Sequence, residues 1–265
     1  MRSPNVMVLN AAGINCNDET AHAFELFGAP VEQIHISELE SGDRNLADFQ
    51  ILALPGGFSD GDAIQAGRTL GLQLRTQLAY ELNDFVDRGG LILGPCNGFQ
   101  ILTETGLLPT GRIEPGQPKK LSLVRNTHGR FVDNWQYLLT EKSRCLFAQP
   151  EDIGELIELP IANGEGREVG DDTSNLVNEL RTMGQIVFRY ATKEGLPAST
   201  FPDNPSGSEY GITGVCDPSG QILGLMPHPE RFVDTKQHPN WRRGEGQVAF
   251  GGLIIEQMIK VAKEI

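Results

Sequence analysis

The sequence has no hydrophobic run long enough to cross a membrane. No stretch approaches the roughly 18 consecutive apolar residues that a transmembrane helix needs. The N-terminus passes directly into a short strand-like segment, Val6 to Leu9, without the apolar core and cleavage site of an export signal. We therefore expect a cytoplasmic protein that does not associate with membranes.

Basic residues are also scarce, with 22 Lys and Arg against 35 Asp and Glu, which gives a net charge of −13. Nucleic-acid binding depends on clustered basic residues, so this balance argues against a nucleic-acid partner. The sequence also lacks the Gly-x-x-x-x-Gly-Lys-Ser/Thr loop that cradles nucleotide phosphates. We expect no ATP site and no other cofactor in this chain.

Cysteines are few, and they are far apart: Cys16, Cys96, Cys145 and Cys216 form no Cys-x-x-Cys pair. This spacing fits neither a disulfide framework nor a zinc site, which favours a reducing compartment and no bound metal. Three of them lack both glycine flanks and a partner base, so we interpret these as structural cysteines. Cys96 differs, because glycines lie on both sides of it.

Strands and helices alternate in the first half of the chain. Strand-like segments are expected at Val6–Asn10, Val31–Ile36, Gln50–Leu54 and Leu91–Leu93, and helices at Asp18–Phe27 and Thr69–Arg88. This alternation predicts an α/β fold with a flavodoxin-like, mostly parallel sheet that helices cover on both faces. We expect one domain over residues 1–265, with its site at the C-terminal ends of the strands.

The second half contains more strands and fewer helices. Strands are expected at Lys119–Val124, Arg130–Leu139, Ile153–Leu159, Gln185–Tyr190, Tyr210–Cys216 and Gln221–Met226, and helices at Ser174–Met183 and Gln247–Ile265. We expect these to add antiparallel strands beside the first sheet. Residues 191–200 and 233–246 are expected to form surface loops. His22, His35, His128 and His238 are interpreted as surface or helix-face residues.

Cys96 lies in the segment Gly94-Pro95-Cys96-Asn97-Gly98, between the apolar run Leu91-Ile92-Leu93 and a helical pattern. A reactive residue between a strand and a helix, with small neighbours, is typical of a nucleophile elbow. Glycine flanks are needed because a Cβ there would collide with the adjoining backbone. The helix start behind the residue would stabilise a thiolate.

Two further segments could complete a site around Cys96. His228 follows another apolar run, and Glu230 lies two residues later, which suits a base and the carboxylate that orients it. Near the front of the chain, Pro55-Gly56-Gly57-Phe58 forms a glycine-rich turn after a strand. Main-chain N–H groups of such a turn could stabilise an oxyanion.

The order Pro-Gly-Gly, Gly-x-Cys-x-Gly-x-Gln and His-Pro-Glu resembles the class I, or triad, glutamine amidotransferases. Further segments resemble the branch that forms the glutaminase subunit of phosphoribosylformylglycinamidine synthase. These segments are Leu54–Asp62, Cys96–Pro109, Pro160–Gly166, Asn204–Ser208 and Met226–Arg231. The resemblance extends from about Asn5 to the C-terminal helix, and the Cys-Asn-Gly-Phe-Gln-Ile-Leu block is highly specific.

The resemblance implies a mechanism and a set of partners. Cys96 would attack glutamine, His228 would carry the proton, and Glu230 would hold the imidazole. The implied oxyanion and substrate-binding residues are Gly56, Gly57, Phe58, Asn97 and Gln100. Ammonia would pass to a large synthetase subunit that uses ATP and magnesium, and the family commonly adds a third, small subunit.

The sequence departs from the pattern of this branch at three positions. Asn163 stands where the branch usually has His, Asp60 replaces a frequent Tyr, and Pro95 replaces an aliphatic residue. Alternatives therefore remain at this stage. The chain could be the glutaminase subunit of another synthetase, a free-standing cysteine hydrolase, or a catalytically silent binding subunit.

Overall fold

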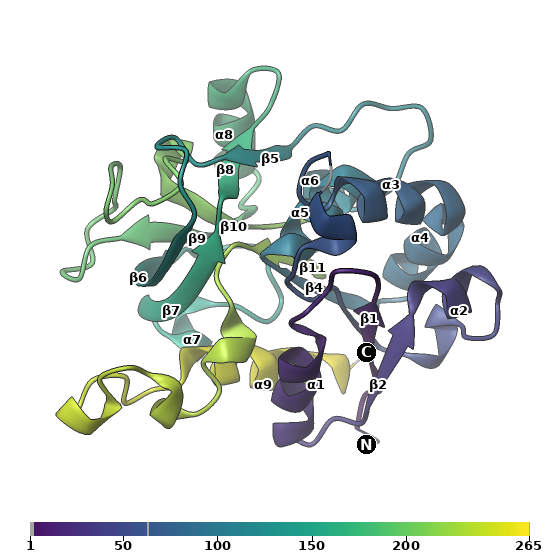
Figure 1. Ribbon diagram of the computed structural model, residues 1–265, viewed down its shortest axis with the longest axis horizontal. Helices are drawn as coiled ribbons and strands as arrows, with labels where there is room; N and C mark the ends of the chain where they lie inside the picture. Colours follow the sequence, from purple (N-terminus) through teal and green to yellow (C-terminus); the bar gives the residue numbers. More distant parts are fainter. Residues whose placement is uncertain (1–2, 63, 265) are drawn as a thin grey trace.

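A nine-stranded sheet forms the centre of the molecule, with the strand order β2-β1-β3-β4-β11-β10-β9-β6-β7 (Figure 1). The computed structural model describes residues 3–62 and 64–264. The strands of this sheet are β1 (Val6–Asn10), β2 (Val31–His35), β3 (Ile51–Ala53), β4 (Leu91–Pro95), β6 (Val132–Thr140), β7 (Leu156–Asn163), β9 (Ile186–Ala191), β10 (Ile212–Cys216) and β11 (Ile222–Leu225).

The sheet has a parallel part and an antiparallel part. Strands β2, β1, β3, β4 and β11 run parallel, so their C-terminal ends meet at one edge. Strands β10, β9, β6 and β7 continue the sheet in antiparallel pairs. This arrangement confirms the predicted flavodoxin-like sheet with added antiparallel strands in the second half.

Helices cover both faces of the sheet, and the residues Val6 to Leu9 of β1 are accordingly all apolar. Val6 and Val8 belong to the core on one face, beneath α1 (Asn17–Leu26) and α9 (Phe250–Ala262). Met7 and Leu9 belong to the opposite core. That core is covered by α3 (Arg68–Gln77), α4 (Ala79–Asp87) and α5 (Asn97–Thr105) (Figure 1). Burial on both faces is typical of a parallel strand and explains its continuous hydrophobic run.

The remaining elements are short or lie beside the sheet. Helices α2 (Ile36–Glu40), α6 (Leu107–Thr110), α7 (Pro150–Ile153) and α8 (Thr173–Thr182) complete the α-helices of the described residues. Strands β5 (Ser122–Arg125) and β8 (Glu165–Val169) form a separate two-stranded antiparallel sheet. In the described part of the chain, no helix combines the length and apolar character that crossing a membrane requires.

Some predicted elements were wrong. The single helix expected over Thr69–Arg88 is two helices, because the backbone of Leu78 turns to φ −126° and buries its side chain in the core between them. Strand β8 was not predicted, because it contains charged residues and its buried positions do not show an apolar alternation. The expected strand at Ile153 begins only at Leu156. The predicted helix end at Ile265 lies outside the described residues.

His238 is a further correction, because it is buried rather than on the surface. Its ring packs edge-on against Trp135, with ring centroids 4.6 Å apart, and also lies beside Phe232. Its Nε2 atom lies 3.4 Å from a carboxylate oxygen of Glu158. The histidine therefore anchors residues 233–246 to the antiparallel part of the sheet, a tertiary contact that local sequence does not indicate.

Glu168 on β8 is a buried carboxyl whose two oxygens have no hydrogen-bond partner among the described residues. Burial raises its pKa to about 8, although the neighbouring Ser208 hydroxyl partly opposes the rise. In the unfolded chain this carboxyl ionises near its ordinary pKa of 4.5, so the unfolded state loses its proton first as pH rises. Folding stability should therefore fall between about pH 4.5 and pH 8, by at most ~1.4 kcal/mol per pH unit.

We predict that Glu168→Gln stabilises the protein at pH 8 and has little effect at pH 5. The amide keeps the shape of the protonated acid and removes the need to bury a charge. Urea unfolding at both pH values measures the difference, with the exposed Glu256→Gln as control. A Glu168→Gln variant that is less stable than the unmodified protein at pH 8 would contradict this explanation.

Candidate active site

Cys96 lies at a sharp turn between β4 and α5. Its φ of 50° and ψ of −105° place a non-glycine residue in the left-handed half of backbone space. Such a conformation persists only where the surroundings enforce it, and it clusters at functional sites. Gly98 permits the turn, because a Cβ at that position would lie 1.9 Å from the carbonyl oxygen of Leu54.

His228 reaches Cys96 through the pairing of two parallel strands. Strands β11 and β4 are neighbours, with Leu225 opposite Pro95, and the Cys96 N–H donates to the Leu225 carbonyl at 2.7 Å. The His228 N–H in turn donates to the carbonyl of Pro160 on β7 at 2.8 Å. These main-chain bonds fix where the imidazole can lie.

Glu230 holds the imidazole at Nδ1, and Nε2 has no hydrogen-bond partner among the described residues. Its Oε1 atom lies 2.6 Å from Nδ1 of His228, and both side chains are buried. Burial alone lowers the pKa of His228, but the Glu230 carboxylate and then Cys96 outweigh it, so this pKa lies well above its ordinary value. The arrangement therefore favours a charged imidazolium beside the cysteine.

The turn after β3 forms the third part of the site. Gly56 lies against the imidazole, since a Cβ there would be 2.8 Å from Cε1 of His228. Gly57 has a φ of 146°, and the Phe58 N–H is already bound to the carbonyl of Gly13 at 2.9 Å. Gly57 rather than Phe58 is therefore the better candidate for an oxyanion donor in this turn.

Asn97 and Gln100 connect the segments around the nucleophile. The Asn97 side chain accepts from the Ser59 N–H at 3.2 Å and donates to Gln100 at 2.9 Å. Gln100 donates to the carbonyl of Glu165 at 2.7 Å. Gln100 is thus buried instead of facing solvent. The Asn97 N–H belongs to the first turn of α5, where amides have no intrahelical acceptor.

A pocket of about 240 Å³ opens over Cys96. Besides the residues already described, its wall contains four charged side chains that the sequence analysis did not single out: Asp62, Arg125, Arg130 and Glu165. Asn163, which replaces the usual His, is buried at this wall and donates to Asn126 at 3.2 Å. Asn163 therefore links the end of β7 to the segment that follows β5.

Cys16 was interpreted as structural although it follows the first strand near the expected edge of the site, and it lies beside the His228–Glu230 pair. Its Sγ atom, a ring nitrogen of His228 and a carboxylate oxygen of Glu230 all lie within 4.8 Å of one another. These donor types could hold a metal ion. However, the Arg231 guanidinium donates to Cys16 Sγ at 3.0 Å, and Glu230 already binds Nδ1. The positively charged guanidinium beside the thiol disfavours the binding of a metal cation. The three side chains therefore fit a network that exchanges protons better than a metal site.

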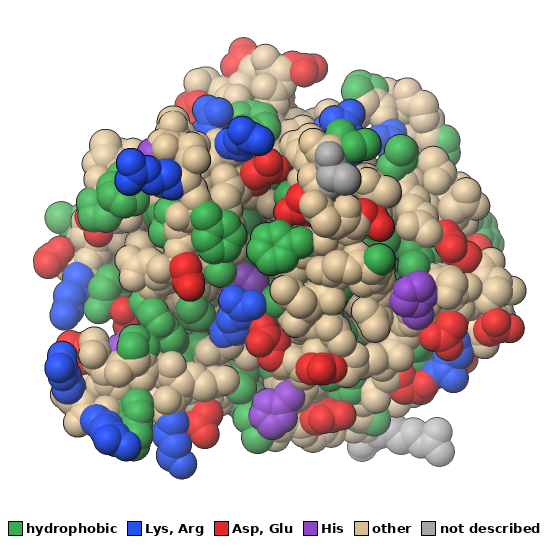
Figure 2. All heavy atoms as spheres, viewed as in Figure 1, with side chains coloured by type: hydrophobic (Ala, Val, Ile, Leu, Met, Phe, Trp, Pro, Cys, Tyr) green, Lys and Arg blue, Asp and Glu red, His purple; other side chains and the backbone are tan. Residues whose placement is uncertain are grey.

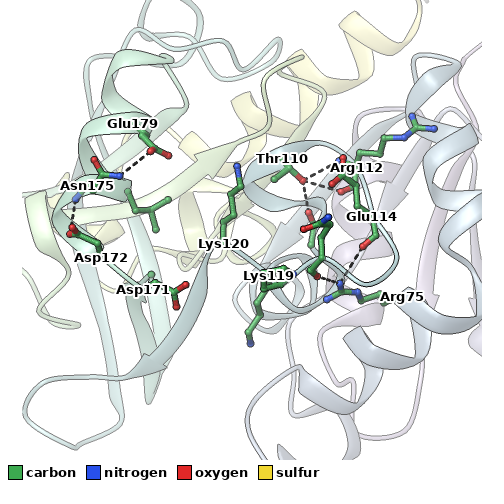
Figure 3. A pocket seen from close by; sticks show the side chains of 15 residues that line it. Arg75, Thr110, Arg112, Glu114, Lys119, Lys120, Asp171, Asp172, Asn175 and Glu179 are labelled. Carbon is green, nitrogen blue, oxygen red and sulfur yellow. Dashed lines mark hydrogen bonds between the residues drawn. The ribbon is translucent and has the colours of Figure 1, made fainter.

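A second pocket, of about 370 Å³, lies between residues 110–120 and the start of α8 (Figure 3). Arg75 donates there to the carbonyls of Glu114 and Gln117, and Lys119 pairs with Glu104. Asp172 caps α8 at the Asn175 N–H. Among the described residues, neither a cysteine nor a histidine lines this pocket. The Cys96 pocket is therefore the candidate active site.

Comparisons with known proteins agree with this fold and geometry. The family model of the CobB/CobQ-like glutamine amidotransferase domain matches residues 3–259. Subunit PurQ of phosphoribosylformylglycinamidine synthase from Dehalococcoides mccartyi is 42% identical over 267 residues, which cover 100% of both chains. The PurQ subunit of Methanococcus maripaludis is 40% identical over 97% of this chain and 93% of its own.

A solved structure is similar over the same length. One chain of the structure of PurLQS from Thermotoga maritima matches with a TM-score of 0.73 and 30% identity, over 98% of this chain and 99% of that one. The chain therefore belongs to the glutamine amidotransferase family, in the branch of the PurQ subunits of phosphoribosylformylglycinamidine synthase. The predicted membership of this branch is confirmed, whereas the roles of individual site residues stay predictions.

We predict that limiting iodoacetamide at neutral pH alkylates Cys96 before the other three cysteines. Cys96 lines the open pocket. Burial raises the pKa of the Cys16 and Cys216 thiols, and it raises that of Cys145 to about 12, so few thiolates form there. Peptide mass spectrometry measures the order, and urea-unfolded protein, in which all four should react, is the control. Equal rates for Cys16 and Cys96 would refute it.

Proposed function

We propose that this chain hydrolyses glutamine to glutamate and ammonia as the glutaminase subunit of phosphoribosylformylglycinamidine synthase in purine biosynthesis. One observation supports the proposal: the paired strands β4 and β11 end beside one another, so that Cys96, which lines the pocket, lies near the buried His228–Glu230 pair. The full-length similarity to PurQ subunits supports the choice of synthase. We treat residues 1–265 as a single domain that performs this one reaction.

The first chemical step is attack by the Cys96 thiolate on the side-chain amide carbon of glutamine. The carbonyl oxygen becomes an oxyanion, which the N–H groups of Gly57 and Asn97 would stabilise. Losing one such donor typically costs about 3 kcal/mol of barrier. His228, held charged by its buried neighbours, gives its proton to the departing nitrogen, so that ammonia leaves and a thioester remains.

The second step is hydrolysis of the glutamyl thioester. Neutral His228 takes a proton from an attacking water molecule, and the carbon–sulfur bond breaks to release glutamate and the Cys96 thiolate. Glu230 keeps the imidazole in one tautomer and stabilises its charged form in both steps. The complete triad argues against a catalytically silent binding subunit.

The ammonia is used by a partner. The similar Thermotoga maritima chain comes from a structure described as PurLQS, and we infer a corresponding complex here, with a large synthetase subunit and a small third subunit. ATP and magnesium would be bound by the synthetase subunit, and we assign no cofactor to this chain. The basic pair Arg242–Arg243 in residues 233–246 is a candidate contact with an acidic surface of the partner.

We predict that Cys96→Ala abolishes glutamine-dependent synthesis by the complex, because no thioester can form. Synthesis from added ammonium salt should continue, since the amination site belongs to the partner. The two activities are measured on the same preparation, with Cys145→Ala as a control for loss of a buried thiol. If ammonium fails to rescue a properly assembled Cys96→Ala complex, the proposed division of labour is incorrect.

We also predict that the isolated chain is a poor glutaminase and that its partner activates it. A free glutaminase would waste glutamine, so we expect docking to complete the productive geometry. Adding the synthetase with its nucleotides should raise the rate of glutamine hydrolysis at least tenfold, which corresponds to ~1.4 kcal/mol of barrier. Full activity of the isolated chain, unchanged by the partner, would favour a free-standing hydrolase.

A further inference from the structure

Arg231 follows Glu230 directly in the chain, yet its guanidinium group is turned toward helix α1. Its Nε atom donates to a carboxylate oxygen of Glu19 at 2.7 Å, and its Nη2 atom donates to Sγ of Cys16 at 3.0 Å. Both partners belong to the start of α1, since Cys16 is the N-cap of this helix. Neither step of the hydrolysis uses these three side chains, so their contacts have another role.

The Glu230 carboxylate has one oxygen without a donor. Its Oε1 atom is bound to Nδ1 of His228 at 2.6 Å, whereas its Oε2 atom is buried and has no hydrogen-bond partner within the described part of the chain. A guanidinium group binds carboxylates readily, because its N–H groups match the two oxygens. Arg231 would therefore be expected to bind Oε2, and its contacts with α1 indicate what prevents it.

Arg231 lies close to both members of the buried pair. The Cys16 sulfur that accepts from Arg231 also lies within 4.8 Å of a Glu230 carboxylate oxygen and of a His228 ring nitrogen. Burial by itself would lower the pKa of Arg231, but the hydrogen bond to Glu19, and then the neighbouring thiol and carboxylates, raise it above its ordinary value. The guanidinium therefore stays charged beside a carboxylate that it does not bind.

The charged form of the imidazole depends on the groups around it. The Glu230 carboxylate and then the Cys96 and Cys16 thiols favour the imidazolium of His228. Beyond Cys16 lies the positive charge of Arg231, which the Glu19 carboxylate balances. A Glu230 carboxylate shared with a guanidinium would stabilise the imidazolium less, because part of its negative charge would be neutralised.

We propose that Glu19 is a positioning residue that holds the Arg231 guanidinium away from Glu230. The carboxylate then serves His228 alone. This inference rests on the proposed function. Without the Glu19 charge the guanidinium turns to Oε2 of Glu230, and the imidazolium loses its proton more readily. Less acid remains to protonate the departing nitrogen, and the deficit grows as pH rises.

The test is the pH profile of kcat for glutamine hydrolysis by the complex with the synthetase subunit. Glu19→Gln should move the alkaline limb to lower pH, with kcat about tenfold lower at the alkaline end and nearly unchanged at the acidic end. Glu19→Asp keeps the charge and should largely restore the profile. Glu25→Gln alters an exposed carboxyl on the same helix and should have no effect. No loss for Glu19→Gln, or an equal loss at every pH, would overturn the proposal.

A double variant tests whether Glu19 acts through Arg231. Arg231→Gln removes the guanidinium that would compete for Glu230, so that adding Glu19→Gln should cause no further change in the pH profile. Residues that act through one another are non-additive in this way. If Glu19→Gln shifts the alkaline limb equally with and without the guanidinium, the proposed competition is wrong.

A titration of the imidazole itself separates this inference from the proposed reaction. NMR spectra of the full chain follow the Cε1–H signal of His228, identified by its loss in His228→Gln. Glu19→Gln should move the midpoint of this signal to lower pH, and Arg231→Gln should cancel the change. If the midpoints behave so but the unmodified complex releases no ammonia, the hydrolytic function fails while the role of Glu19 stands. Identical midpoints in a chain whose complex releases ammonia would refute the role of Glu19 alone.

Discussion

The site depends on the parallel pairing of β4 with β11. These strands come from distant parts of the chain, and the N–H of Cys96 itself donates to Leu225 on the neighbouring strand at 2.7 Å. A slip of one residue would move the end of β11 by about 3.3 Å and reverse which face each of its side chains occupies. His228, three residues after Leu225, would then no longer meet the cysteine. The position of His228 is therefore determined by the register of the sheet.

Close approach of the main chain is the second constraint on the site. Three segments converge on a small volume, and Gly56 and Gly98 are the positions where a single methyl group would collide with the imidazole or with the strand end. The backbone of Cys96 adopts an unfavourable conformation at the point where these segments meet. The hydrophobic cores on both faces of the sheet supply the rigidity that keeps it there, while the antiparallel strands (Figure 1) carry the loops that shape the pocket. On the face shown in Figure 2, acidic and basic side chains are interspersed around hydrophobic ones.

The sequence permits prediction of those features that have a local cause. The elbow at Cys96 could be predicted because an apolar strand, paired glycines and a helix follow one another directly, and the parallel sheet follows from regular alternation. The environment of Asp62 could not be predicted, since it depends on Glu165 from strand β8 and on a left-handed backbone at an aspartate. His238 and Glu168 were unpredictable for a similar reason, because only the tertiary fold buries them. Polar residues whose burial comes from distant neighbours leave no periodic pattern.

The central claim is that Cys96, rather than the nearby Cys16, carries the glutamyl group during turnover. The most direct measurement is to mix the complex with glutamine, quench it in acid within the first turnover, and identify modified peptides by mass spectrometry. Acid preserves a thioester long enough for this purpose. We predict a glutamyl adduct on the peptide that contains Cys96 and none on the peptide that contains Cys16. An adduct on Cys16, or ammonia release with no cysteine adduct at all, would contradict the account.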